Sequence, residues 1–389
     1  MTSTSQGDSS IPFIPLSAYY FFYFAAVGTL IPYLGLYLQS LSFGAMEIAQ
    51  ITAVLAMARI ISPPLLALLA DRQGQFLFYA QLTSFISAIL VLGFWWLDDY
   101  DSLLWLMWWL GFFWHAALPP MESLTLRTLG NNLSLYSRIR LWGSIGFIVA
   151  VLAVGYLIEQ LGIRVFLWAM SLFFALMALI TLFNHEQPHT RKQGLNLTDL
   201  WQSIKNPIVI LVLTLALLVQ LSHGVYYAFY SLLLDNAGYS ASDIGLLWTL
   251  GVVAEVMLFW HFSRFQARLS FKNWLLVATG LTVVRWTMIA SFADVWWWLA
   301  IAQLLHAATF GIFHSVVVQW LHRAFHAHQA QGQALYVSIT YGIGGMLGSL
   351  LAGYAWGVGQ GSAAFLLAAS AALIAFGMVF WLPKHSKST

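Results

Sequence analysis

The sequence predicts an all-α polytopic membrane protein whose twelve transmembrane helices form two pseudo-symmetric halves of six helices each. Three observations carry this prediction: the composition, the spacing of the apolar runs, and an internal repeat. Of the 389 residues, 60% are hydrophobic and only 8% are charged, whereas a soluble domain has roughly 25% charged residues. Most of the protein surface must therefore face lipid.

Apolar runs long enough to cross a bilayer recur along the whole chain. A helix needs about 20 apolar residues to span a hydrocarbon core roughly 30 Å thick. We expect helices at residues 15–39, 46–70, 75–97, 102–126, 139–160, 163–184, 206–236, 242–266, 271–292, 295–322, 330–357 and 360–382. They divide into an N-terminal six-helix bundle at 1–184 and a C-terminal one at 206–389, which a polar cytoplasmic linker at 185–205 joins.

The charged residues are sorted between alternate loops. Of the 16 Lys and Arg, 12 lie in the tails and in every second loop, while the other loops carry mostly Asp and Glu. Cytoplasmic loops are enriched in Lys and Arg, so we expect a multi-pass protein with both termini in the cytoplasm. The net charge of +2 gives no reason to expect a nucleic-acid partner, and the absence of Cys excludes disulfides and Cys nucleophiles.

The two halves repeat weakly at an offset of 196 residues. This offset aligns Glu47 with Asp243, and Arg59 with Glu255. Internal symmetry is typical of secondary transporters, in which the substrate binds near the membrane midplane where two repeats meet. We therefore expect Arg59 and Glu255 at related depths on either side of a central cavity.

The segment after the second predicted helix contains Asp71, Arg72 and Gly74, and it resembles the cytoplasmic signature of the major facilitator superfamily. The resemblance implies the major facilitator fold. It also implies a gating motif in which these three residues shape a tight loop and tie helix ends together by charge. The second-half copy, at 263–272, keeps basic residues but lacks the Asp and the Gly.

A closer resemblance runs over nearly the whole chain. The segments 139–144, 238–256 and 284–286 are similar to those of the 3-phenylpropionate permease group, which is related to lactose permease and to nucleoside–proton symporters. The resemblance implies a proton-driven importer in the bacterial inner membrane. It further implies an aromatic monocarboxylate as substrate, a functional monomer, and no metal or organic cofactor.

Comparison with lactose permease points to residues of the ninth and tenth predicted helices. His306 matches the His of that protein, and Arg285 resembles the Arg beside its proton carrier. Gln303 stands where lactose permease has Lys, and Thr309 stands where it has the proton-carrying Glu. The proton site must therefore differ in this chain.

Charged residues inside the predicted spans are the main candidates for function, because each costs roughly 2.5–3.5 kcal/mol to insert. Glu255 is the first candidate for proton carrier, since an apolar site favours the protonated carboxyl, and Glu122 is its competitor. Arg59 and Arg140 are candidates for the substrate carboxylate, which a guanidinium grips through two parallel hydrogen bonds. In lactose permease the residues that Glu122 and Arg140 match contact sugar. The alternatives are an Arg59–Glu255 ion pair that locks the halves, and an Arg140 that anchors its helix at the interface.

Polar and aromatic residues on two further helices complete the predicted site. His223, Tyr226 and Tyr227 lie on one face of the seventh helix, and Gln303 and His306 share a face of the tenth. Packing is the alternative for the aromatic residues, and internal hydrogen bonding is the alternative for His314 on that tenth helix. We expect the following residues to contact substrate: Arg59, Glu122, Arg140, His223, Tyr226, Tyr227, Gln303 and His306. We expect proton coupling to involve Glu255, Glu122, Arg285 and His306.

Together these features predict a proton symporter that imports a small organic acid, resembling 3-phenylpropionate, by alternating access. Three alternatives stay open: a proton symporter for a sugar or nucleoside, an antiporter that exports drugs or metabolites, and a lipid scramblase, which would need no proton coupling. The sequence contains no metal-ligand cluster, nucleophile elbow or phosphate-binding loop, so we do not expect an enzyme.

Overall fold

The computed structural model describes residues 12–130, 132, 134–186, 205–326 and 329–383, which contain helices and no strands. The first bundle comprises α1 (Phe13–Ser40), α2 (Ala45–Gln73), α3 (Phe76–Leu90) with the 3-10 segment η1 (Val91–Trp95), α4 (Tyr100–Leu129), α5 (Ser134–Leu161) and α6 (Val165–Thr181). The second bundle comprises α8 (Pro207–Asn236), α9 (Ala241–Phe265) with η2 (Gln266–Arg268), α10 (Phe271–Ser291), α11 (Trp296–Leu304), the π-helical η3 (Ala307–Ile312), α12 (Phe313–Ala324), α13 (Gln329–Val337), the π-helical η4 (Ser338–Gly344) and α14 (Gly345–Val379). Most of the predicted linker, 187–204, lies outside the described residues.

The helices follow the predicted apolar runs closely, with informative differences. Among the described residues, nine helices are long and apolar enough to cross a membrane, so the count of twelve crossings stays a prediction. The fifth predicted helix, 139–160, is extended at its start, because α5 begins at Ser134. Basic residues ended the apolar run there, although the backbone continues as a helix. The break expected between 357 and 360 is a kink at Gly359 and Gln360 inside α14.

Local sequence signals explain where several helices begin. Asn206 caps α8 by accepting a hydrogen bond from the Ile208 amide, and Pro207 occupies the first turn, where no amide hydrogen is needed. Ser240 and Asp243 cap α9 reciprocally, as in a capping box. These signals fix the start of the two helices that carry much of the candidate site.

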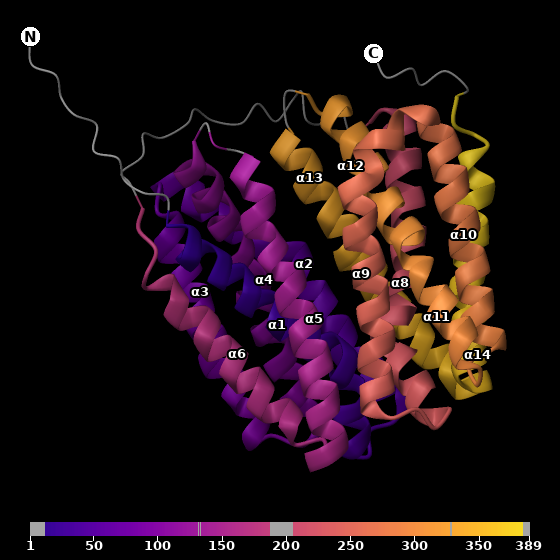
Figure 1. The fold of residues 1–389 in the computed structure, drawn as a ribbon, viewed down its shortest axis with the longest axis horizontal. Helices are drawn as coiled ribbons and strands as arrows, with labels where there is room; N and C mark the ends of the chain where they lie inside the picture. The colour runs from indigo at the N-terminus through magenta and orange to yellow at the C-terminus, as the bar shows by residue number, and fades with distance from the viewer. Residues whose placement is uncertain (1–11, 131, 133, 187–204, 327–328, 384–389) are drawn as a thin grey trace, which may run out of the picture.

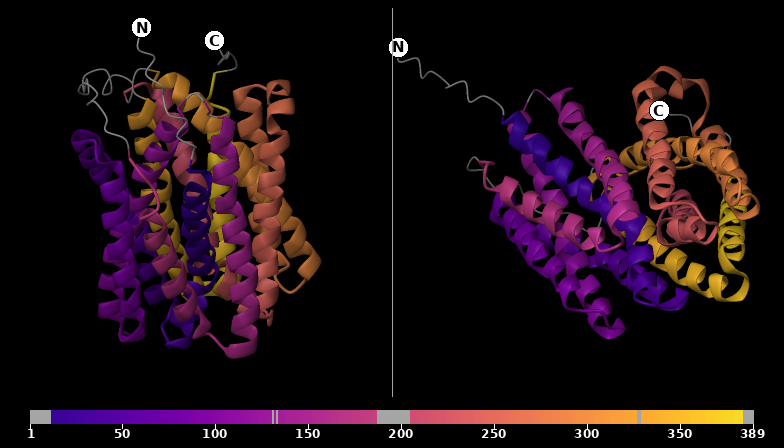
Figure 2. Two further views of the ribbon diagram at one scale, coloured as in Figure 1. Left: turned by 60° about the vertical axis from the view of Figure 1, so that its left-hand side comes forward. Right: turned by 60° about the horizontal axis from the view of Figure 1, so that its bottom comes forward.

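The two bundles lie side by side (Figures 1 and 2), with α14 packed against α2 and α9 packed against α5. Several contacts between them lie at the end of the protein where α1 ends and α2 begins, which we call the α1–α2 end. There Ser349 donates to the Ala49 carbonyl at 2.9 Å, and the Ser242 amide donates to Glu159 at 3.3 Å. The bundles are therefore held together at the α1–α2 end.

A glycine makes the close approach of α14 to α2 possible. A Cβ atom added at Gly353 would lie 2.4 Å from the Cβ of Ala49 and 3.0 Å from the carbonyl oxygen of Ala45. Small residues let membrane helices approach closely. On the same helix, a Cβ atom at Gly357 would meet nothing within 4 Å.

We predict that Gly353→Ala lowers the thermal stability of the purified protein, whereas Gly357→Ala does not. Alanine gains roughly 1 kcal/mol over glycine in a helix interior, but overpacking a tight contact costs about 1–3 kcal/mol. Only position 353 is overpacked by alanine, so the Gly357→Ala protein controls for the gain in helix propensity. Equal melting temperatures of the two variants in detergent would show that this contact does not need a glycine.

Candidate functional site

A fully buried arginine organises the polar residues of the second bundle. The Arg285 guanidinium, from α10, donates hydrogen bonds to His306 at 2.9 Å, Thr309 at 3.2 Å and Gln303 at 3.3 Å. The three acceptors follow one another at spacings of three residues where α11 passes into η3, so they share one face of the helix. Arg285 therefore ties α10 to this neighbouring helical run.

The contact with Arg285 fixes the hydrogen-bonding role of His306. A guanidinium only donates hydrogen bonds, so the Nδ1 atom that it contacts must be an acceptor. In neutral imidazole the proton then sits on Nε2, which faces a Glu255 carboxylate oxygen at 3.4 Å. His306 thus lies between a buried positive charge, Arg285, and the Glu255 carboxylate on α9.

Aromatic side chains and an amide surround the guanidinium in place of a direct carboxylate partner. It lies 4.5 Å from the ring centre of Tyr226 and 4.4 Å from that of Trp286, where cation–π attraction stabilises it. The Tyr226 hydroxyl donates to Gln303 at 3.0 Å. His223 packs beside Trp286, with its ring centre 6.1 Å from that of His306. The structure therefore gathers most predicted residues of the second bundle into one buried cluster.

Arg59 has a partner that sequence reasoning missed. Its Nε atom donates to the His115 ring at 3.0 Å, so α2 and α4 meet at this pair. The sequence contained a feature that could have identified this partner, because His115 is a polar residue within the apolar run at 102–126. Arg59 is half-buried. Tyrosines of both bundles lie within electrostatic reach of its guanidinium: Tyr23, Tyr227 and Tyr341.

The other two charges of the first bundle are placed without a close ion pair. Arg140 lies inside α5 rather than at its start, and its guanidinium sits 4.0 Å from the ring centre of Phe24. Among the described residues, neither Arg140 nor Glu122 has an opposite charge within 4.0 Å.

The structure does not contain the Arg59–Glu255 ion pair considered as an alternative. Within the described ranges, only two ion pairs have N···O distances of 4.0 Å or less, namely Arg127–Asp71 and His306–Glu255. Arg59 contacts a histidine instead. Two half-buried guanidinium groups, of Arg59 and Arg140, therefore lack a carboxylate partner at contact distance.

The residues of the predicted gating motif lie at the opposite end from the α1–α2 end. Asp71 pairs with Arg127 of α4 at 3.5 Å, and the Arg127 guanidinium sits 3.9 Å from the ring centre of Phe76. Gly74 ends α2 with a φ of 68°, a conformation that glycine adopts most readily. Arg72 is exposed. The arrangement joins α2, α3 and α4, and its gating role stays a prediction.

Comparison with known proteins places this architecture in a family. The model of the MFS_1 like family matches residues 13–367. The chain is 26% identical over 328 residues to the probable 3-phenylpropionic acid transporter of Escherichia coli (strain K12), covering 83% of this chain and 86% of the relative. It is 25% identical to the maltose permease of Geobacillus stearothermophilus, covering 95% and 94%. The crystal structure of a mutant of the nucleoside transporter NupG superposes with a TM-score of 0.82 at 18% identity, covering 95% of this chain and 99% of the other.

We predict that His306 is the tautomer with hydrogen on Nε2 and not on Nδ1, because Arg285 donates to Nδ1. Nitrogen-15 NMR of protein labelled only at histidine distinguishes the tautomers, and the signal that His306→Gln removes is the one to assign. A signal typical of protonated Nδ1 at that position would contradict the arrangement. His261→Gln, which changes an exposed histidine on α9, is the control for assignment.

Proposed function

Because this chain belongs to the MFS_1 like family, we propose that it is a proton-coupled symporter that imports a small organic acid. The family and its fold make the chain a multi-pass secondary transporter of small molecules, and not an enzyme. The substrate and the coupling ion are the parts that we propose. An aromatic monocarboxylate resembling 3-phenylpropionate is the substrate class that the relative from Escherichia coli favours.

One observation carries the proposal of an anionic substrate. Five charged residues lie deep inside the spanning helices: Arg59, Glu122, Arg140, Glu255 and Arg285. They comprise three arginines and two glutamates, so one positive charge is left without a counter-charge while both glutamates are ionised. Because an unbalanced charge in a membrane span is costly, the site is complementary to a monoanion. A neutral sugar or nucleoside would leave this charge unbalanced.

Arg59 and Arg140 are the residues that we propose for the substrate carboxylate. Both are half-buried and lack a carboxylate within 4.0 Å in the described structure, whereas Arg285 is fully buried and already makes three hydrogen bonds. The Phe24 ring, 4.0 Å from the Arg140 guanidinium, suits a substrate that carries a ring. Glu122 and the buried set of His223, Tyr226, Gln303 and His306 would then shape and support this site.

Glu255 is the proton carrier in this proposal. Burial in the membrane favours the neutral carboxyl, whereas the His306 imidazole at 3.4 Å and the positive charge of Arg285 behind it favour the carboxylate. These opposing influences suit a group that gains and loses a proton during transport. Glu122 has no basic side chain within 4.0 Å among the described residues and is the less favoured candidate.

The charge bias of the loops supports an orientation in the bacterial inner membrane. By the positive-inside rule the end that carries Asp71 and Arg127 is cytoplasmic. The α1–α2 end, where the bundles are held together, would then face outward, as in an inward-facing state, and we propose that the protein functions as a monomer. The Asp71–Arg127 contact of the gating motif would exchange with contacts between the bundles during the cycle.

We predict that proteoliposomes take up protons when 3-phenylpropionate is added, and that Glu255→Gln abolishes this uptake while preserving exchange of labelled substrate. Exchange needs no net proton movement, so its retention shows that the variant is folded and binds substrate. Glu122→Gln is the matched comparison and should retain proton uptake. Loss of proton uptake in Glu122→Gln alone would transfer the role of carrier to Glu122.

The same assay decides between the substrate classes. Proton uptake with maltose or a nucleoside and none with 3-phenylpropionate would overturn the organic-acid proposal and favour the neutral symporter. Proton movement in the direction opposite to that of the substrate would establish an antiporter instead.

We predict that Arg59→Lys and Arg140→Lys each raise the KM for 3-phenylpropionate about tenfold or more. Lysine keeps the charge but loses the paired hydrogen bonds, and one hydrogen bond to a charged group contributes about 1.5–3 kcal/mol. Arg138→Lys, at an exposed position of α5, is the control and should leave KM unchanged. The neutral analogue 3-phenylpropionamide should not be transported, and its transport at the rate of the acid would contradict the role of the carboxylate.

A further inference from the structure

Two tyrosine hydroxyls approach the same ring nitrogen of His314. Tyr336 of α13 lies 3.1 Å from Nδ1, and Tyr341 of η4 lies 3.3 Å from the same atom. An imidazole nitrogen has either one lone pair or one hydrogen. It therefore forms one good hydrogen bond at a time, and the two hydroxyls compete for it.

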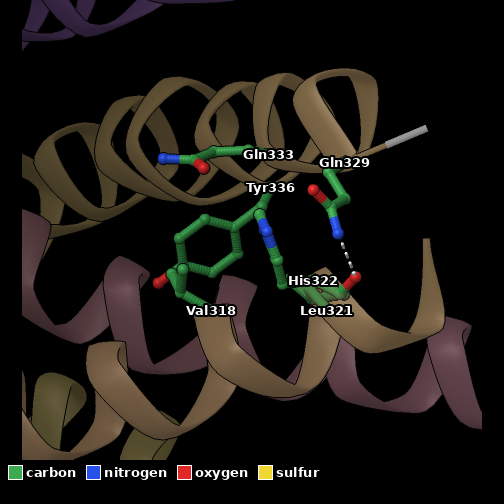
Figure 3. Close-up of a pocket in the computed structure, with 6 residues that line it drawn as sticks. All are labelled: Val318, Leu321, His322, Gln329, Gln333 and Tyr336. Atoms are coloured by element: carbon green, nitrogen blue, oxygen red, sulfur yellow. Dashed lines mark hydrogen bonds between the residues drawn. The ribbon is translucent and has the colours of Figure 1, made fainter. Parts of the chain in front are cut away.

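Tyr336 is the tyrosine that is fixed in place. It is 3% exposed and lines a small pocket between α12 and α13 together with Val318, Leu321 and His322 (Figure 3). Its contact with His314 is also the shorter of the two. Tyr336 is thus the permanent partner of His314, and the Tyr341 hydroxyl is the one that another acceptor can draw away.

Tyr341 belongs to η4, which packs against α2 where the two bundles meet, at the residue that follows Arg59 in the sequence. The neighbouring Gly342 packs against Ile60 so closely that a Cβ atom there would lie 2.4 Å from the Ile60 side chain. Ser338 donates to the Ile60 carbonyl at 3.4 Å. Tyr341 is half-buried and belongs to the π-helical η4, a type of segment that is frequent at functional sites.

The charged and titratable groups around Tyr341 and His314 come from several helices. Arg59 of α2, Tyr227 of α8, Glu255 of α9 and Tyr336 of α13 lie within electrostatic reach of Tyr341. Glu255 also lies within electrostatic reach of His314. The charges of both the proposed anion site and the proposed proton site therefore act on Tyr341 or on its partner His314.

We propose that Tyr341 is a substrate-positioning residue whose hydroxyl switches from His314 to the substrate carboxylate when Arg59 holds that carboxylate. This inference rests on the proposed function. Arg59 belongs to the first bundle and Tyr341 to the second, so the bound carboxylate bridges the bundles. Tyr336 takes over the Nδ1 atom of His314, which keeps the imidazole paired after Tyr341 leaves.

The competition between the two tyrosines gives a specific thermodynamic signature. Removing the Tyr341 hydroxyl deletes a hydrogen bond to a charged ligand, so Tyr341→Phe should weaken 3-phenylpropionate binding about tenfold. Tyr336→Phe should weaken it only about threefold, because Tyr341 must then give up the sole hydroxyl contact of His314. In the double variant Tyr341 is absent, and the Tyr336 substitution should have no further effect.

The experiment is a double-mutant cycle of dissociation constants, measured by calorimetry on the full-length protein in detergent. Affinity of the double variant equal to that of Tyr341→Phe supports the switch, since coupled residues give non-additive effects. Additive effects, or unchanged affinity in Tyr341→Phe, overturn it. Phenylalanine keeps both rings, and melting temperatures check the fold. If the wild-type protein binds no 3-phenylpropionate, the proposed substrate is overturned as well. Failure of the tyrosine switch alone is thus distinguished from failure of the proposed function.

Discussion

The guanidinium of Arg285 is the constraint on which the site in the second bundle depends. A positive charge buried in a membrane helix must be matched by acceptors or by opposite charge. Here α11 and η3 supply three neutral acceptors, and aromatic rings cover the faces of the guanidinium. His306 is oriented by this contact, and through it so is the environment of Glu255. The cluster is only partly satisfied, because Arg285 Nε, Gln303 Nε2 and His223 Nε2 are buried without a hydrogen-bond partner among the described residues.

The charged and polar residues of the site form two sets, one buried and hydrogen-bonded within the protein and one half-buried without a carboxylate partner. Arg285, Gln303 and His306 are buried and paired with one another. Arg59 and Arg140 are half-buried and contact a histidine and an aromatic ring. The proposed anion site uses the second set, whose guanidinium groups have no carboxylate within 4.0 Å in the described ranges.

The sequence predicted the helices and the residue types of the site better than it predicted the contacts. Apolar runs and loop charge depend on the membrane alone, so they can be read without tertiary structure. Helical spacing predicted that Gln303 and His306 share a face, but it did not predict that Arg285 contacts both of them. The contact between Arg59 and His115 joins two helices at a long sequence separation, which no local pattern encodes. The role of Tyr341 depends on the π-helical η4, whose wider turn changes which residues share a face.

The departure from lactose permease has a structural consequence. In the comparison, Gln303 and Thr309 stand where that protein has a Lys and its proton-carrying Glu. Both neutral replacements accept hydrogen bonds from Arg285, so the arginine keeps its partners without a carboxylate on its own neighbouring helix. The carboxylate within reach is instead Glu255 on α9, with His306 between them. Relative to lactose permease, this chain lacks one Lys and one Glu, so the net charge of the site is the same in both proteins. The carboxylate of this chain, Glu255, lies instead at the position that the internal repeat pairs with Arg59. A proton on Glu255 and an anion on Arg59 would therefore occupy symmetry-related positions on the two sides of one site.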